Sequence, residues 1–149
     1  MTPGVLEIDE ACRVALAHGH RLCRTPVFIG DAEPFVARVL AQQYMEFLKA
    51  PAFVARFPEF THDFLWSFRG PFVDRFDCVR VGWASAPSDD RVEQTLRRLS
   101  RDGRNPPEIR ISSPDGVDDF AAVAFYHIVA FYNDFAVEIG VDPEIELSW

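Results

Sequence analysis

One segment near the C-terminus, residues 118–140, restricts the fold more than any other part of the sequence. It reads "DDFAAVAFYHIVAFYNDFAVEIG" and begins with two acids, which suit the positive end of a helix. A helix that is apolar on nearly every side must be buried on most faces or shared with a partner. We therefore expect a helix over 118–135. The tail, residues 135–141, alternates in polarity and is equally compatible with a strand.

The remaining elements follow from periodicity and from turn residues. We expect a helix over 8–18 that ends at Gly19, and a turn or a short helix over 51–58. Further helices are expected at 31–50, 59–69 and 90–103, and strands at 25–30, 77–85, 108–112 and 144–149. Helices and strands do not alternate regularly. We therefore expect an α+β fold with a three- or four-stranded, mainly antiparallel sheet and four to five helices that cover one face.

Size and composition indicate an ordinary globular chain. The sequence has 149 residues, 48% of them hydrophobic and 26% charged, which fits a single domain over residues 1–149. No apolar run reaches the roughly 18 residues of a membrane span, and the N-terminus lacks the pattern of a secretory signal. The three cysteines (Cys12, Cys23, Cys78) form an odd and sparse set. We therefore expect reduced thiols, a cytoplasmic protein and no membrane association.

The charge is distributed unevenly along the chain. The net charge is −8, yet residues 1–110 hold 15 basic and 15 acidic side chains, whereas residues 111–149 hold no Lys or Arg. The acids of this last quarter are Asp115, Asp118, Asp119, Asp134, Glu138, Asp142, Glu144 and Glu146. A field of one sign repels nucleic acid and attracts basic partners. A solvated acidic face that only maintains solubility is the alternative.

The aromatic stretch "FTHDFLWSFRGPF", residues 60–72, is the second unusual feature of the sequence. Its phenylalanines recur at steps of three and four residues, which is typical of a helix face buried in a core. Trp66 and Arg69 lie off this stripe, beside His62 and Asp63. Tryptophan and arginine on an exposed helix face are the composition of a binding hot spot.

No catalytic or cofactor motif is present. The sequence lacks G-x-S-x-G, H-E-x-x-H and the P-loop pattern. His127 or His62 can act as a general base only if the fold brings a carboxylate to it. The cysteines and histidines of residues 12–23 lack the tight C-x(2–4)-C spacing of a structural zinc site. We therefore expect no metal and no cofactor, and we consider an enzyme less well supported than a binding protein.

These features favour a small acidic protein-binding module of the inhibitor, immunity or adaptor kind. It would engage a basic surface of a partner protein through acids and aromatic anchors. The expected contact residues are Trp66, Arg69, Asp115, Asp118, Asp119, Glu138, Asp142, Glu144, Glu146 and Trp149. One alternative is an enzyme or small-ligand-binding domain with an aromatic cavity that uses His62 or His127. Another is a structural subunit that forms a homo-oligomer through the 118–135 helix.

Overall fold

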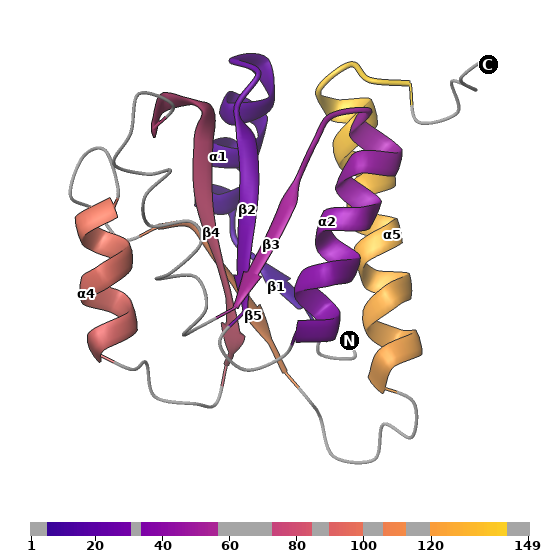
Figure 1. Ribbon diagram of the computed structural model, residues 1–149. Helices are drawn as coiled ribbons and strands as arrows, with labels where there is room; N and C mark the ends of the chain where they lie inside the picture. The colour runs from indigo at the N-terminus through magenta and orange to yellow at the C-terminus, as the bar shows by residue number, and fades with distance from the viewer. Residues whose placement is uncertain are drawn as a thin grey trace.

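The computed structural model describes residues 6–30, 34–56, 73–84, 90–99, 106–112 and 120–142. They form a five-stranded sheet with the order β1-β5-β4-β2-β3, together with four α-helices (Figure 1). The strands are β1 Leu6–Ile8, β2 Thr25–Gly30, β3 Phe53–Arg56, β4 Phe76–Trp83 and β5 Glu108–Ile111. The helices are α1 Glu10–Arg21, α2 Pro34–Leu48, α4 Asp90–Leu99 and α5 Phe120–Glu138, and a 3-10 turn covers Val73–Arg75.

The sheet is mixed, and most of its neighbouring strands are parallel. β2 pairs in parallel with both β3 and β4, and β4 pairs in parallel with β5. Only β1 runs antiparallel, against β5. The α+β class is confirmed, but the expectation of a mainly antiparallel sheet of three or four strands is wrong. The physical reason is that α2 connects β2 to β3 and α4 connects β4 to β5, and such crossovers join parallel strands.

The two strands that the sequence did not reveal are the edge strands. β1 has three residues and β3 has four. The residues of β3 were expected to form a turn or a short helix, and Ile8 of β1 was expected to begin a helix. The three residues of β1 are too few for a periodicity to emerge, and β3 lies between Pro51 and Pro58, which favoured a turn. The interior strand β2 was predicted at its observed bounds, because "TPVFIG" is an apolar run between turn residues.

Helices cover both faces of the sheet rather than one. Buried residues of α1, α2 and α5 form one core with Phe28, Val79 and Ile109. On the other face, Val92 and Leu96 of α4 pack against β2 and β3. Figure 1 shows α4 on one side of the sheet and the pair α2 and α5 on the other. Because the central strands are covered on both sides, Val27, Phe28 and Ile29 of β2 are all buried.

A buried polar and aromatic cluster joins α2 to α5. The Tyr132 hydroxyl donates a hydrogen bond to the Leu40 carbonyl at 2.8 Å. The rings of Tyr132 and Tyr44 meet edge to face at 6.0 Å, and Tyr44 also contacts the ring of Phe28 from β2. The hydrogen bond satisfies a hydroxyl that would otherwise be buried without a partner. The contact fixes α5 along α2 and leaves its opposite side turned away from the core.

Helix α1 begins and ends differently from the expectation. Asp9 caps it, and its carboxylate accepts a hydrogen bond from the Cys12 amide at 2.7 Å. The helix continues through Gly19 and ends where Cys23 adopts a φ of +57°. The amide of Arg24 then bonds to the carbonyl of Gly19, and that of Cys23 to His20. This is a Schellman ending with cysteine in the position usually taken by glycine.

Gly19 lies where α1 closely approaches the Asp77 carboxylate of β4, and it does not end the helix. A Cβ atom at this position would lie 2.5 Å from Oδ2 of Asp77, whose other oxygen lies 3.9 Å from the Arg24 guanidinium. Alanine in a helix stabilises by up to about 1 kcal/mol over glycine, but overpacking costs about 1–3 kcal/mol. We expect Gly19→Ala to lower the free energy of unfolding by about 1 kcal/mol in urea denaturation. In an Asp77→Ala background the same change should stabilise, and an equal loss in both backgrounds would contradict the explanation.

The C-terminal helix extends through the segment whose structure the sequence left open. α5 reaches Glu138, and Gly140 follows with a φ of +81°. The amide of Val141 bonds to the carbonyl of Ala136, and that of Gly140 to Val137. This is again a Schellman ending, here with the usual glycine. Residues 135–138 are therefore helical, and the residues of the expected strand 144–149 lie outside the described residues.

Candidate functional site

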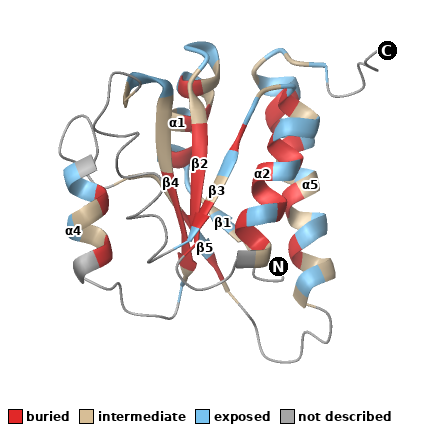
Figure 2. Ribbon diagram, viewed as in Figure 1, coloured by how far each residue is buried: buried red, intermediate tan, exposed pale blue. Residues whose placement is uncertain are grey.

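The side of α5 that faces away from the core exposes large apolar side chains. Tyr126 is 71% exposed, Val137 is 67% exposed and Phe125 is 39% exposed. Tyr126, Ala130, Asn133 and Val137 follow steps of four, three and four residues, so they lie along one side of the helix. All four are exposed, and Figure 2 shows buried and exposed residues on the same helix. We call these four residues, together with Phe125, the outer face of α5.

Acidic residues accompany this outer face toward the C-terminal end of the helix. Asp134, Glu138 and Asp142 are all exposed. The last turn of α5 contains no basic residue, and residues 111–149 contain no Lys or Arg. The C-terminal end of a helix is negative, and the helix dipole favours cations rather than acids there. These acids therefore do not complement the helix dipole.

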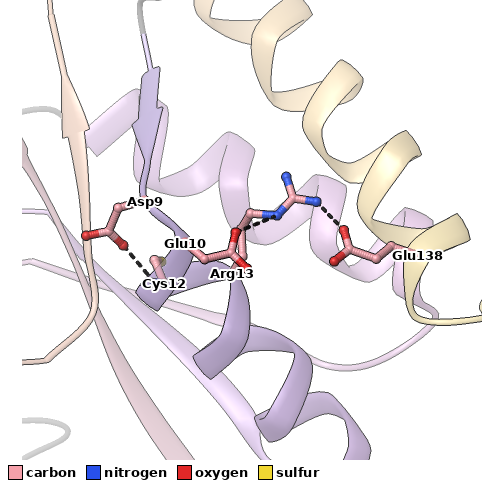
Figure 3. Close-up of polar contacts among 5 residues, drawn as sticks. All are labelled: Asp9, Glu10, Cys12, Arg13 and Glu138. Carbon is pink, nitrogen blue, oxygen red and sulfur yellow. Dashed lines mark hydrogen bonds and ion pairs between the residues drawn. The ribbon is translucent and has the colours of Figure 1, made fainter.

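Glu138 forms an ion pair with Arg13 of the same chain. The Arg13 guanidinium of α1 donates a hydrogen bond to the Glu138 carboxylate (Figure 3). The same guanidinium lies 4.0 Å from the Glu10 carboxylate and 5.4 Å from the centre of the Phe131 ring. The pair ties the end of α5 to α1 and partly neutralises Glu138. Asp134 lies one turn earlier and is the more informative acid for mutagenesis.

Only part of the predicted contact set lies in the described residues. Glu138 and Asp142 do, and the fold brings both to the C-terminal end of α5. Trp66, Arg69, Asp115, Asp118, Asp119, Glu144, Glu146 and Trp149 lie outside the described residues, as does His62. His127 lies on α5 and is half-buried.

The sequence pattern did not identify the exposed residues Phe125, Tyr126 and Val137 as contact candidates. Their signal was present in the all-round apolar character of the helix. Only the apolar residues on one side of α5 can pack into the core. The remaining apolar residues must therefore be exposed to solvent or covered by a partner.

A second location follows from the topology alone. β2 and β4 are neighbours, but the chain leaves β2 for β3 on one side and leaves β4 for β5 on the other. Ligands of open α/β sheets bind where the connections diverge in this way, beside the carboxyl ends of the strands. Helices α2, α4 and α5 all begin at this edge of the sheet (Figure 1). The connections 31–33 and 85–89 lie outside the described residues.

The described residues contain no group of three or more His, Cys, Asp or Glu side chains that could hold a metal ion. Cys12 is buried, and burial raises the pKa of its thiol to about 12, with a smaller effect from Asp9. Such a thiol is protonated at neutral pH and is a poor nucleophile and metal ligand. Cys12 therefore acts as a core residue.

Among the described segments, α5 is a helix long and apolar enough to cross a membrane by length and composition. Its most apolar window has a mean hydropathy of 1.4, and 28% of that window is buried in the domain. Core helices of soluble proteins can meet the same criteria. The low buried share shows that α5 carries more apolar surface than the core covers.

Comparison with known proteins gives a structural likeness but no family. No family model matches the sequence, and no curated protein matches it. The structure resembles that of a hypothetical protein, TT0462, from Thermus thermophilus, with a TM-score of 0.59 and 16% sequence identity. The match covers 89% of this chain but only 40% of TT0462. At this identity the likeness concerns the fold alone.

Proposed function

We propose that this protein is a protein-binding module, of the inhibitor or adaptor kind, that engages a basic surface of a partner protein through the outer face of α5. The observation that carries the proposal is the joint exposure of Tyr126 and Val137 on a helix side bordered by acids. Exposed apolar patches mark interaction sites in soluble proteins. Tyrosine is also among the residues most enriched at binding hot spots.

The charge supports the choice of partner. Asp134, Glu138 and Asp142 place negative charge at this end of α5, residues 111–149 hold no Lys or Arg, and Arg13 of α1 is paired with Glu138. Complementary fields accelerate the encounter of two proteins, whereas buried aromatic side chains slow their dissociation. Asp134 lies near the negative end of the helix, which does not favour an acid. A role in recognition accounts for its position.

Reversing the charge of Asp134 tests the proposal without damaging the fold. We expect Asp134→Lys to leave the free energy of unfolding unchanged or slightly raised, because a cation suits this end of the helix. We expect the same variant to retain much less of a salt-eluted partner when immobilised protein is exposed to extract of its own cells. Quantitative mass spectrometry of the eluate measures the loss. Glu7→Lys is the matched control, because Glu7 is exposed on β1 and points away from the sheet face that α5 covers.

The expected result is a protein that wild type and Glu7→Lys retain and that Asp134→Lys loses. Equal retention by all three forms would show that any captured protein binds elsewhere. Retention of nothing by wild type would overturn the proposal as well. Glu138→Lys is a poorer test, because it also breaks the ion pair with Arg13.

A small-ligand-binding domain is the second candidate, and the reversal of strand order between β2 and β4 favours it. Three helices begin at that edge, and helix N-termini favour anionic groups. Titration with inorganic phosphate, followed by NMR, discriminates the two candidates. Shifts confined to Gly30 and Ala84 would favour this site, whereas no shift there leaves the outer face of α5 as the proposed site.

A further inference from the structure

The geometry of the outer face of α5 points to the kind of partner it fits. We infer that the occupant is an amphipathic helix of the partner protein with basic residues along one flank, an inference that rests on the proposed function. Tyr126 and Val137 lie eleven residues apart, or about 16 Å along the helix axis. This is a contact length of about three turns, which suits one helix packed along another.

The side chains along this line have the sizes that helix packing uses. Between the large residues Tyr126 and Val137 stand the small Ala130 and the medium-sized Asn133, both exposed. Two helices pack about 8–10 Å apart depending on the side chains at the contact, and a small central residue permits a close approach. Apolar residues of a partner helix at steps of three and four can pack against Ala130.

An extended segment fits this surface less well. Strand residues rise about 3.3 Å each and alternate between two sides. A strand laid along a convex helix would therefore touch it with only every second side chain. The backbone groups of α5 are bonded within the helix, so α5 offers no edge for strand addition.

The charge selects a basic helix over a second copy of α5. Asp134 and Glu138 border the outer face on one side, and α5 itself has no Lys or Arg to place against them. Pairing α5 with a copy of itself would bring acids to the contact without a cation from either helix. A partner helix with Lys or Arg on the matching flank supplies that cation.

The test uses three synthetic peptides of about 20 residues and equal length. The first is an amphipathic helix with a Leu/Ala stripe and a Lys/Arg flank, the second is a scramble of it without the stripe, and the third replaces the cations of the first with Glu. Fluorescence anisotropy measures binding to wild type, to Asp134→Lys and to Glu7→Lys. We expect the basic helix to bind wild type and Glu7→Lys at least tenfold more tightly than the scramble does. We expect it to bind Asp134→Lys more weakly than it binds wild type.

The outcomes distinguish failure of the helical inference from failure of the proposed function. Equal affinity for the basic helix and its scramble would overturn the helical partner while leaving a basic partner in place. Equal affinity for the acidic and basic helices would contradict the basic partner itself. No binding of any peptide would overturn the helical inference, whereas the capture experiment with Asp134→Lys judges the proposed function independently. Self-association of wild type, lost in Tyr126→Ala, would assign the surface to a second copy instead.

Discussion

Raising the pH above about 9 is expected to unfold this protein progressively, because three buried groups must remain protonated in the fold. Burial raises the pKa of Cys12 from 9.0 to about 12. Burial also raises the pKa of Tyr44 and of Tyr132 above the usual value of 10.0, with smaller effects from Asp77 on Tyr44 and from Tyr44 on Tyr132. The unfolded chain releases these protons at the ordinary values. Between pH 9 and 12 the unfolded state therefore binds fewer protons than the native state, and stability falls as the pH rises.

The expected slope is steep enough to measure. Each such group lowers the free energy of unfolding by about 1.4 kcal/mol per pH unit once its unfolded form has titrated. The cysteine contributes from about pH 9 and the tyrosines from about pH 10, so the loss reaches several kcal/mol by pH 11. This is comparable to the total stability of a small domain. Urea denaturation at each pH gives the curve.

Two variants test whether Cys12 and Tyr44 cause this loss of stability with pH. Cys12→Ala should reduce the loss of stability between pH 10 and 11 by about 1.3 kcal/mol and Tyr44→Phe by about 1.0 kcal/mol, even if each is less stable at neutral pH. A stability that stays flat to pH 11 would mean that these groups are more solvated than the structure places them. A slope that neither variant changes would assign the effect to other residues.

Truncating the outer face of α5 should abolish most of the partner affinity while leaving the fold intact. The variant combines Tyr126→Ala with Val137→Ala. Hot-spot truncations cost about 2 kcal/mol or more, so we expect the dissociation constant to rise by at least about 30-fold. Surface substitutions usually change stability by no more than about 0.5 kcal/mol. Isothermal titration with the captured partner, alongside urea denaturation, measures both quantities.

The matched control is Phe53→Ala. Phe53 is 46% exposed, and it lies in β3 in register with Val27, on the sheet face that α4 covers. Its ring also contacts Phe76, so this variant is expected to lose some stability but no affinity. An affinity that falls equally in both variants would show a general effect of truncation. An unchanged affinity in the α5 variant would contradict the proposed surface.

The sequence was sufficient to predict the central elements of the fold. β2, β4, β5 and the main helices are long or strongly periodic, and their bounds came close to the observed ones. The strand order and the parallel pairing were not predictable from periodicity, because they depend on which strands meet in three dimensions. Gly19 was expected to end α1 because glycine often does so, yet its role comes from the nearby Asp77 of β4. A contact between residues so far apart in sequence leaves no local signal.

The candidate site was only half visible in the sequence. The one-sided charge of residues 111–149 identified Glu138 and Asp142 as acids of the last quarter. The apolar pattern of α5 indicated either a buried helix or a shared one but could not say which residues the core would cover. That depends on where α2 contacts α5, through Tyr132 and Leu40. The exposed Tyr126 is therefore a product of the packing rather than of the local pattern.

Position-specific photocrosslinking in the protein's own cells tests the central claim most directly. A benzophenone-bearing phenylalanine analogue replaces Tyr126 in one strain and Phe53 in another, because both positions carry exposed aromatic rings on opposite sides of the sheet. We predict that irradiation links a discrete partner protein to position 126 and not to position 53. A partner linked only at position 53, or none at position 126, would contradict the assignment of the outer face of α5 as the binding surface.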